Sequence, residues 1–333
     1  MQHSNFPHIQ PAATATALAD RWQGELQFFW RNMQSGVLTT SDNIALHYQM
    51  HLTPNARHAV VISAGRVEMA VKYAELSFEL VEAGYSVFIA DHRGQGLSQR
   101  QLKNPHKGFV RSFEDYQSDL AQFVNQIVLP AGHQYHIAIG HSMGCAILGG
   151  YLQQYQHPFH AAILASPMFG IYTGLVPASI AEPIALAVVR LNRLCSNTPW
   201  YFPGQSDYRE KAFDANPLTG SKERYQWLQQ LYREQPDSQL GGVTTDWIQA
   251  AIAAMHSIKK RALTWQTPVL LLQAAQDKVV SNFAQQQWFQ RLPDKLYHHK
   301  EIIADAHHEM FMETDAIRAQ VFQYINQFLA KLP

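Results

Sequence analysis

Short apolar runs alternate with helical stretches along this chain, and this alternation constrains the fold more than any other feature. The runs are HAVVISAG (58–65), YSVFIAD (85–91), YHIAIG (135–140), HAAILAS (160–166), PVLLLQAA (268–275) and KEIIAD (300–305). Runs without a polar face are typical of strands buried on both sides, and intervening helices make neighbouring strands parallel. We therefore predict an α/β fold with a mostly parallel central sheet and helices on both faces.

The intervening and flanking segments complete this pattern. We predict helices over 68–82, 113–128, 143–155, 284–291 and 315–332. Before the first run, the spacing of apolar residues predicts a helix over 14–33, and two antiparallel strands follow around a turn at 41–43.

One connection is far too long for an ordinary link between a helix and a strand. It runs from Pro167 to Pro268 and contains helical patterns at 180–194 and 244–258. We interpret it as a helical cap inserted over the carboxyl edge of the sheet, where open α/β sheets bind ligands. The predicted organisation is an N-terminal helix with edge strands (1–57), a first core segment (58–167), the cap (168–266) and a second core segment (267–333).

The composition excludes several classes of protein. Lys plus Arg and Asp plus Glu both number 26, so the formal net charge of zero gives no basic field for nucleic acid. Cys145 and Cys195 are the only cysteines, too few for a disulfide framework or a Cys-rich zinc site. The N-terminus lacks the pattern of a signal peptide, and no apolar stretch is long enough to span a membrane. We expect a cytoplasmic location, with peripheral contact at the inner membrane left open by the composition.

The segment Gly140-His141-Ser142-Met143-Gly144 matches the pattern G-x-S-x-G. In the setting of a preceding strand and a following helix, this pattern predicts a sharp turn that presents a nucleophilic serine. Small residues at both ends allow the backbone to turn without a Cβ clash. The alternative is an ordinary serine in a tight turn.

A nucleophilic serine needs a base, and the base needs an acid that holds its tautomer. Asp277 follows the run 268–275, and His308 follows the run 300–305, so both should lie with Ser142 at the carboxyl edge of the sheet. The order Ser, Asp, His is that of the strand-turn-helix serine hydrolases. His307 is the alternative to His308 as the base, and Asp305 is the alternative to Asp277 as the acid.

An oxyanion formed by serine attack needs preorganised N–H donors. We expect one from the backbone of Met143 and the other from the backbone of Arg66, with Gly65 allowing a close approach. The Arg66 side chain is expected to face solvent or Glu68.

Other residues near this edge have less specific interpretations. Arg66, Arg93 and Lys278 are candidate cations for a head-group phosphate, with solvated loop charges as the alternative. The segment 91–100 lacks the G-x-G-x-x-G and Walker patterns, so Asp91 and Arg93 are expected to hold neighbouring loops. Gly65, His141 and Phe169 are named as candidate substrate contacts, although His141 is also expected to pack beside the turn.

These residues together resemble a known group of enzymes. GHSMG, DHRGQGLS, the Asp277 loop and HHEMFMETD resemble the serine hydrolases of the α/β-hydrolase fold, and more narrowly the bacterial lysophospholipases of the L2 type within the monoacylglycerol-lipase-like group. The similar segments run from about residue 58 to 320, cap included. They also include SAGRVEMAVKYAEL, ASPMFGI, NPLTGSKERYQW, GGVTTDWIQAAI and LLLQAAQDKVVSN.

The resemblance implies that Ser142 is the nucleophile, Asp277 the acid and His308 the base. It implies release of a fatty acid from a lysophospholipid, without a metal or an organic cofactor. Related lipases usually have His-Gly where this chain has Ala64-Gly65. This difference retains the backbone N–H donor but puts in doubt any role for a histidine side chain at that position. The alternatives are a monoacylglycerol lipase, a general carboxylesterase or thioesterase, an acyltransferase or peroxidase, and a non-catalytic binding module. The oligomeric state is not readable from the sequence.

Overall fold

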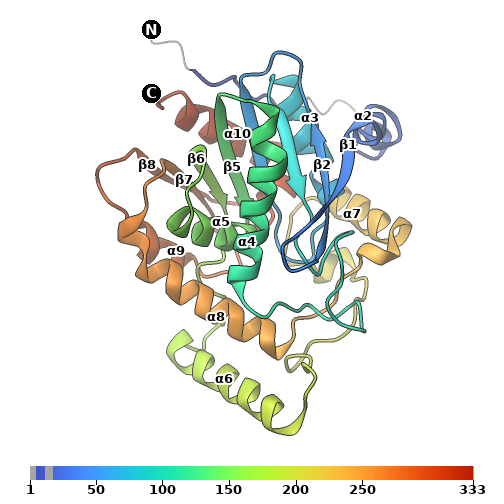
Figure 1. The fold of residues 1–333 in the computed structure, drawn as a ribbon, viewed down its shortest axis with the longest axis vertical. Coiled ribbons are helices and arrows are strands. Elements are labelled where there is room, and N and C mark those ends of the chain that lie inside the picture. The colour runs from blue at the N-terminus through green and yellow to red at the C-terminus, as the bar shows by residue number, and fades with distance from the viewer. Residues whose placement is uncertain (1–4, 12–17, 333) are drawn as a thin grey trace.

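The computed structural model describes residues 5–11 and 18–332, and its centre is an eight-stranded sheet in the order β1-β2-β4-β3-β5-β6-β7-β8 (Figure 1). Strands β1 and β2 pair antiparallel with each other and β2 pairs antiparallel with β4, whereas β3 to β8 run parallel. The strand bounds are β1 Gln34–Thr39, β2 Ala45–His51, β3 His58–Ser63, β4 Ser86–Ala90, β5 Tyr135–His141, β6 Phe159–Ala165, β7 Val269–Ala274 and β8 His298–Ile303. The mostly parallel sheet predicted from the apolar runs is therefore present.

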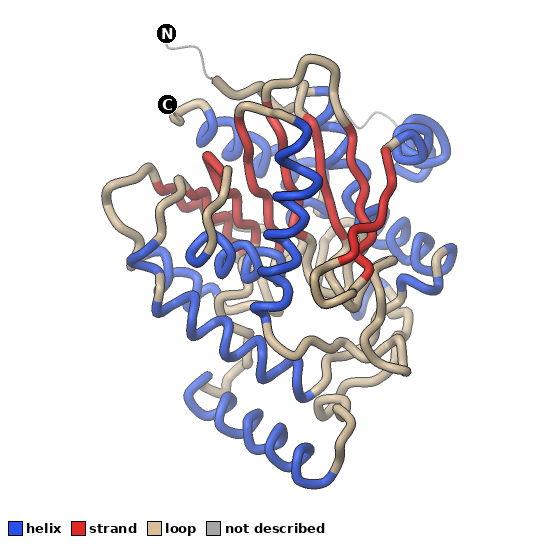
Figure 2. Tube along the Cα trace, in the orientation of Figure 1, coloured by secondary structure: helices blue, strands red, loops and turns tan. Residues whose placement is uncertain are grey.

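Ten α-helices are described in residues 18–332, and they account for most of the predicted helical segments (Figure 2). Their bounds are α1 Leu18–Arg21, α2 Gln27–Asn32, α3 Ala74–Glu82, α4 Phe113–Phe123, α5 Met143–Gln154, α6 Ala178–Cys195, α7 Lys222–Glu234, α8 Thr245–Lys260, α9 Asn282–Phe289 and α10 Asp315–Leu329.

Four predicted elements differ from the structure. The helix expected over 14–33 begins outside the described residues, and its remainder is interrupted at Gly24, whose φ of −109° and ψ of −110° are not helical. The helix expected over 68–82 starts with a 3₁₀ turn at Ala70–Tyr73, and the one over 113–128 ends in a π-helical turn. Strand β8 is an edge strand, and its Ile302 is exposed rather than buried as the apolar run predicted.

The hydrophobic core lies on both faces of the sheet. Successive side chains of a strand point to opposite faces, so Val61 joins a cluster with α4, α5 and α8, whereas Val60 and Ile62 join a cluster with α3 and α10. This double cover explains why the central runs read as apolar throughout. It also fixes the carboxyl ends of β3, β5, β7 and β8 along one edge.

The three long helices of the inserted segment lie in different places. Helix α8 packs directly on α4 and α5, and its Ala251 and Ile258 belong to the core cluster. Helix α6 packs on α8 and forms the outermost layer of the molecule, while α7 lies against the N-terminal α1 (Figure 1). The segment predicted as a cap therefore contributes one helix to the core layer itself, and the boundaries 168 and 266 stay a prediction.

Candidate active site

Ser142 occupies a strained turn between β5 and α5. Its φ of 51° and ψ of −116° lie in a region that residues with a side chain rarely adopt. The two motif glycines are required by space, because a Cβ on Gly144 would lie 2.0 Å from the Ser63 carbonyl oxygen and one on Gly140 would lie 2.8 Å from Leu148 Cδ1. The turn therefore needs the residues that the G-x-S-x-G pattern supplies.

The structure brings Ser142, His308 and Asp277 into one hydrogen-bonded chain. His308 Nε2 lies 2.8 Å from Ser142 Oγ, and His308 Nδ1 lies 2.8 Å from Asp277 Oδ2. The backbone N–H groups of Val279 and Val280 donate to the other oxygen of Asp277, at 2.8 and 3.0 Å. All three side chains are buried, and each comes from a loop at the carboxyl edge of the sheet.

The two alternative residues lie elsewhere. His307 turns away from Ser142, and its Nδ1 lies 2.9 Å from a Glu313 carboxylate oxygen. Asp305 is exposed, and His308 is held by Asp277 instead. Two adjacent histidines in this loop therefore have different partners, and only His308 reaches the serine.

The surroundings of the three hydrogen-bonded side chains favour a neutral His308. Burial lowers the pKa of His308, and although the Asp277 hydrogen bond opposes this effect, the net shift is downward, with the charge of His141 adding to it. Burial raises the pKa of Asp277, but the hydrogen bond from His308 and the N–H groups of Val280 and Val279 outweigh it, so the net shift is downward. At neutral pH, His308 can accept a proton while Asp277 carries a negative charge.

The two backbone N–H groups expected to hold the oxyanion belong to Met143, which follows Ser142, and to Arg66, which lines the same cavity as Ser142. Met143 is the first residue of α5, where N–H groups have no partner within the helix. The Arg66 N–H makes no hydrogen bond to any residue that the structure describes. The loop carrying it is fixed, because Gly65 donates its N–H to the Glu68 carboxylate and accepts from Gln95 Nε2 at 2.7 Å.

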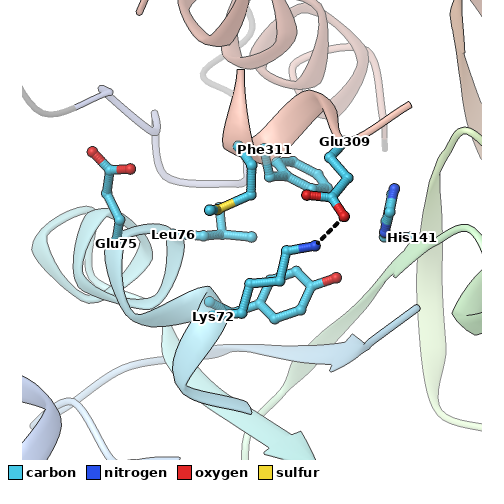
Figure 3. A pocket seen from close by; sticks show the side chains of 8 residues that line it. Lys72, Glu75, Leu76, His141, Glu309 and Phe311 are labelled. Carbon is cyan, nitrogen blue, oxygen red and sulfur yellow. Dashed lines mark ion pairs between the residues drawn. The ribbon is translucent and has the colours of Figure 1, made fainter. Parts of the chain in front are cut away.

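A buried polar cluster, which was not predicted from the sequence, lies behind this loop. Its members are Glu68, Lys72, Tyr73, His141 and Glu309. All of them except Glu68 line a gap of about 10 Å³, together with the apolar Leu76, Phe311 and Met312 (Figure 3). Lys72 Nζ lies 2.8 Å from Glu68 and 2.9 Å from Glu309. The only local signal was the spacing of Glu68 and Lys72, which lie four residues apart in the predicted helix over 68–82 and would therefore share one helix face.

His141 connects this cluster with the candidate base. Its Nδ1 lies 2.7 Å from a Glu68 oxygen, and its Nε2 lies 3.1 Å from the His308 carbonyl oxygen. Because both partners only accept, both ring nitrogens must donate, which makes His141 an imidazolium. Burial lowers the pKa of His141, but the Glu68 charge and hydrogen bond outweigh it, and the net shift is upward.

The remaining predicted residues have structural partners. Arg93 is paired with Asp119 at 2.5 Å and with Asp42 at 2.8 Å, and Asp91 accepts from the N–H groups of Ala70 and Leu97, so both hold loops as expected. The Arg66 side chain does not point to solvent or Glu68, because its Nη1 donates to the Gly241 carbonyl oxygen.

A cavity of about 450 Å³ opens over Ser142 and His308, which is within the range of small-molecule sites. The core contributes Arg66, Val67 and Val279 to its wall. The inserted segment contributes, among others, Tyr208, Leu218, Tyr225, Leu228, Tyr232 and Leu240. Gly65, His141 and Phe169, the candidate substrate contacts, do not line it; both ring nitrogens of His141 are occupied, and Phe169 packs in the core against Trp288.

Comparisons with known proteins show the family of this chain. Residues 54–315 match the family model described as "Serine aminopeptidase, S33". The chain is 35% identical to "Lysophospholipase L2" of Escherichia coli (strain K12) over 94% of this chain and 92% of the relative. It is 30% identical to "Probable lysophospholipase L2" of Haemophilus influenzae over 92% and 95% of the two chains.

A solved structure shares the fold. It is a soluble variant of the monoglyceride lipase from Saccharomyces cerevisiae in complex with a substrate analogue. The TM-score is 0.70 at 18% identity, covering 90% of this chain and 97% of that one.

Proposed function

Since the chain belongs to the serine hydrolase family described as "Serine aminopeptidase, S33" and is a carboxylic ester hydrolase, we propose that Ser142, His308 and Asp277 cleave the acyl ester of lysophospholipids. The observation that carries this proposal is the continuous hydrogen-bonded chain from Asp277 through His308 to Ser142, which opens into the cavity of about 450 Å³.

The first half of the reaction forms an acyl-enzyme. His308 Nε2 takes the Ser142 hydroxyl proton while Oγ attacks the ester carbonyl carbon. The backbone N–H groups of Met143 and Arg66 stabilise the negative oxygen of the tetrahedral intermediate. The intermediate collapses when His308 returns the proton to the leaving glycerol oxygen, which departs as the alcohol product.

The second half releases the fatty acid. A water molecule gives a proton to His308 Nε2 and attacks the acyl carbonyl through the same oxyanion geometry. Collapse of this second intermediate breaks the bond to Ser142 Oγ, which recovers the proton from His308. Asp277 stays charged throughout and holds Nδ1–H, so that Nε2 is the nitrogen that exchanges protons.

The choice of lysophospholipid rests on the names of two relatives and on the cavity. The Escherichia coli and Haemophilus influenzae relatives carry that activity in their names. The apolar wall from Leu218, Leu228 and Leu240 suits one acyl chain, and Arg66 supplies a cation in the same cavity. Monoacylglycerol is the second candidate substrate, because related lipases of this fold act on it by name.

We also propose peripheral contact with a membrane surface through helix α6. Apolar side chains along its outer side are exposed, namely Ile180, Ile184, Leu191 and Leu194, with Leu175 just before the helix. The exposed Arg190 lies beside this stripe, whereas the exposed Arg193 lies 3.6 Å from Asp246 of α8. Apolar and basic residues on one exposed helix are typical of helices that lie in the headgroup region of anionic bilayers. Among residues 5–11 and 18–332, no helix has the length and hydrophobicity needed to cross a bilayer.

The proposed activity is tested by offering lysophosphatidylethanolamine, lysophosphatidylcholine, monoacylglycerol and a short p-nitrophenyl ester to the purified protein. Fatty acid release that is fastest from the lysolipids and absent in Ser142→Ala supports the proposal. Preference for the monoacylglycerol or the short ester would assign the chain to the lipases or general esterases instead. Cytoplasmic location stays a prediction, which fractionation of cells expressing the tagged protein would test.

A further inference from the structure

Arg66 carries a guanidinium group in an unusual position beside the candidate oxyanion site. Its Nη1 donates to the Gly241 carbonyl oxygen at 2.9 Å, and its Cζ lies 5.7 Å from the ring centroid of Trp247. Gly108 leaves room for the group, because a Cβ there would lie 3.1 Å from Nη1. The side chain therefore spans from the loop after β3 to the inserted segment and lines the cavity that contains Ser142.

No carboxylate compensates this charge among the described residues, within the 4.0 Å limit of an ion pair. The buried arginines Arg93, Arg224 and Arg318 differ, since each of them pairs with at least one acid. Nε and Nη2 of Arg66 also make no hydrogen bond within the described chain, although a guanidinium has five donors. Burial lowers the pKa of Arg66 to about 10, which still leaves it charged at neutral pH.

We propose that the Arg66 guanidinium binds the phosphodiester of the substrate head group; this inference rests on the lysophospholipase function proposed above. A guanidinium with free donors in a sheltered cavity is suited to bind two phosphate oxygens at once. The backbone N–H of the same residue faces the site of the ester oxyanion. One residue thus contacts both ends of the glycerol unit that joins the acyl ester to the phosphate.

The other cations at this edge are less suited. Arg93 is satisfied by Asp119 and Asp42, and the exposed Lys278 does not line the cavity. Arg209 and Lys211 do line it, but they lie on the inserted segment and are exposed. Of the three candidate cations named from the sequence, Arg66 is the one that lines the cavity and has no acidic partner among the described residues.

The simplest competing role for Arg66 is to tie the oxyanion loop to the Gly241 loop. A purely structural role would affect every ester alike, because all substrates use the same oxyanion donors. Phosphate binding would affect only substrates that carry a phosphate. The ratio of two kcat/KM values therefore separates the two roles.

The test compares Arg66→Gln, Arg66→Lys and the parent protein on lysophosphatidylethanolamine and on the monoacylglycerol with the same acyl chain. We expect Arg66→Gln to lower the lysolipid-to-monoacylglycerol ratio of kcat/KM by about 10- to 100-fold, the effect of losing hydrogen bonds to a charged group. Arg66→Lys should recover part of the ratio. Lys278→Gln, which removes an exposed charge from the same edge, should leave the ratio unchanged. Thermal midpoints establish that each variant is folded.

A second measurement identifies the bound group. Glycerophosphoethanolamine should inhibit monoacylglycerol hydrolysis by the parent protein, and Arg66→Gln should weaken this inhibition about tenfold or more. Equal inhibition by inorganic phosphate would assign the site to free phosphate and overturn the head-group proposal. Equal loss of both substrates in Arg66→Gln would overturn it as well. If the parent protein cleaves monoacylglycerol but no lysolipid, the proposed function itself fails, before any Arg66 variant is considered.

Discussion

Replacing His141 by Gln should move the acid limb of the pH–rate profile to higher pH. His141 is an imidazolium in the structure because Glu68 and the His308 carbonyl oxygen accept from both of its nitrogens. Its ring centroid lies 4.9 Å from that of His308. A positive charge so close opposes protonation of His308 and so lowers its pKa.

The magnitude follows from Coulomb's law. Two unit charges about 4.9 Å apart at an effective dielectric constant of about 20 repel by about 3.4 kcal/mol, or about 2.5 pKa units. Lys72 stays in place after the substitution, and water entering the site adds screening, so we expect a shift of about 1 to 2 units. The charge of Glu309 also acts to raise the pKa of His308, and it stays in place after the substitution.

The assay is kcat/KM for an uncharged p-nitrophenyl ester between about pH 5 and 8, because only the free enzyme then titrates. His308 must be neutral to accept the Ser142 proton, so its lowered pKa keeps the parent protein active below pH 6.5, the ordinary value for histidine. As the pH falls, His141→Gln should lose activity at a higher pH than the parent protein does. His307→Gln is the matched control, since His307 pairs with Glu313 and should leave the limb in place. An unchanged limb in His141→Gln, or a shift to lower pH, would refute the reasoning.

Three further substitutions test other parts of the account. Asp277→Asn should lower kcat by about 10³- to 10⁴-fold with little change in thermal midpoint, because His308 would lose its tautomer partner; a loss below tenfold in steady-state assays would point to another acid. Gly144→Ala should destabilise the protein by more than about 3 kcal/mol in urea unfolding, since its Cβ would lie 2.0 Å from the Ser63 carbonyl oxygen. A free energy of unfolding within about 1 kcal/mol of the parent value would contradict the close packing at this turn. Leu194→Glu should reduce co-flotation with anionic vesicles severalfold while sparing hydrolysis of the short ester, and undiminished flotation would remove α6 from the membrane proposal.

The features that could be predicted from the sequence are those encoded by neighbouring residues. The elbow at Ser142 depends on two glycines within the same five residues, and the parallel sheet depends on apolar runs that need no knowledge of their partners. Asp277 and His308 follow the last two parallel strands. Because parallel strands end at one edge of a sheet, the sequence predicted that both residues lie near the serine. The pairing itself, at 2.8 Å on each side of His308, needed the structure.

The features that could not be predicted depend on contacts between distant segments. Glu68 and His141 are 73 positions apart, and nothing in either segment predicts that the two side chains meet. Arg66 and Gly241 are 175 positions apart, so no local pattern could predict the direction of the Arg66 side chain. Helix α8 was assigned to the cap for the same reason, because a helical pattern does not say which surface its apolar face covers.

The most direct test of the central claim is serine-dependent release of fatty acid from a lysophospholipid. Purified protein and Ser142→Ala would be compared on lysophosphatidylethanolamine and on the monoacylglycerol with the same acyl chain. We predict rapid release by the parent protein, faster from the lysolipid, and a loss of at least about 10³-fold in Ser142→Ala. Release that persists in Ser142→Ala would contradict the assignment of the nucleophile, and cleavage of the monoacylglycerol alone would contradict the assigned substrate.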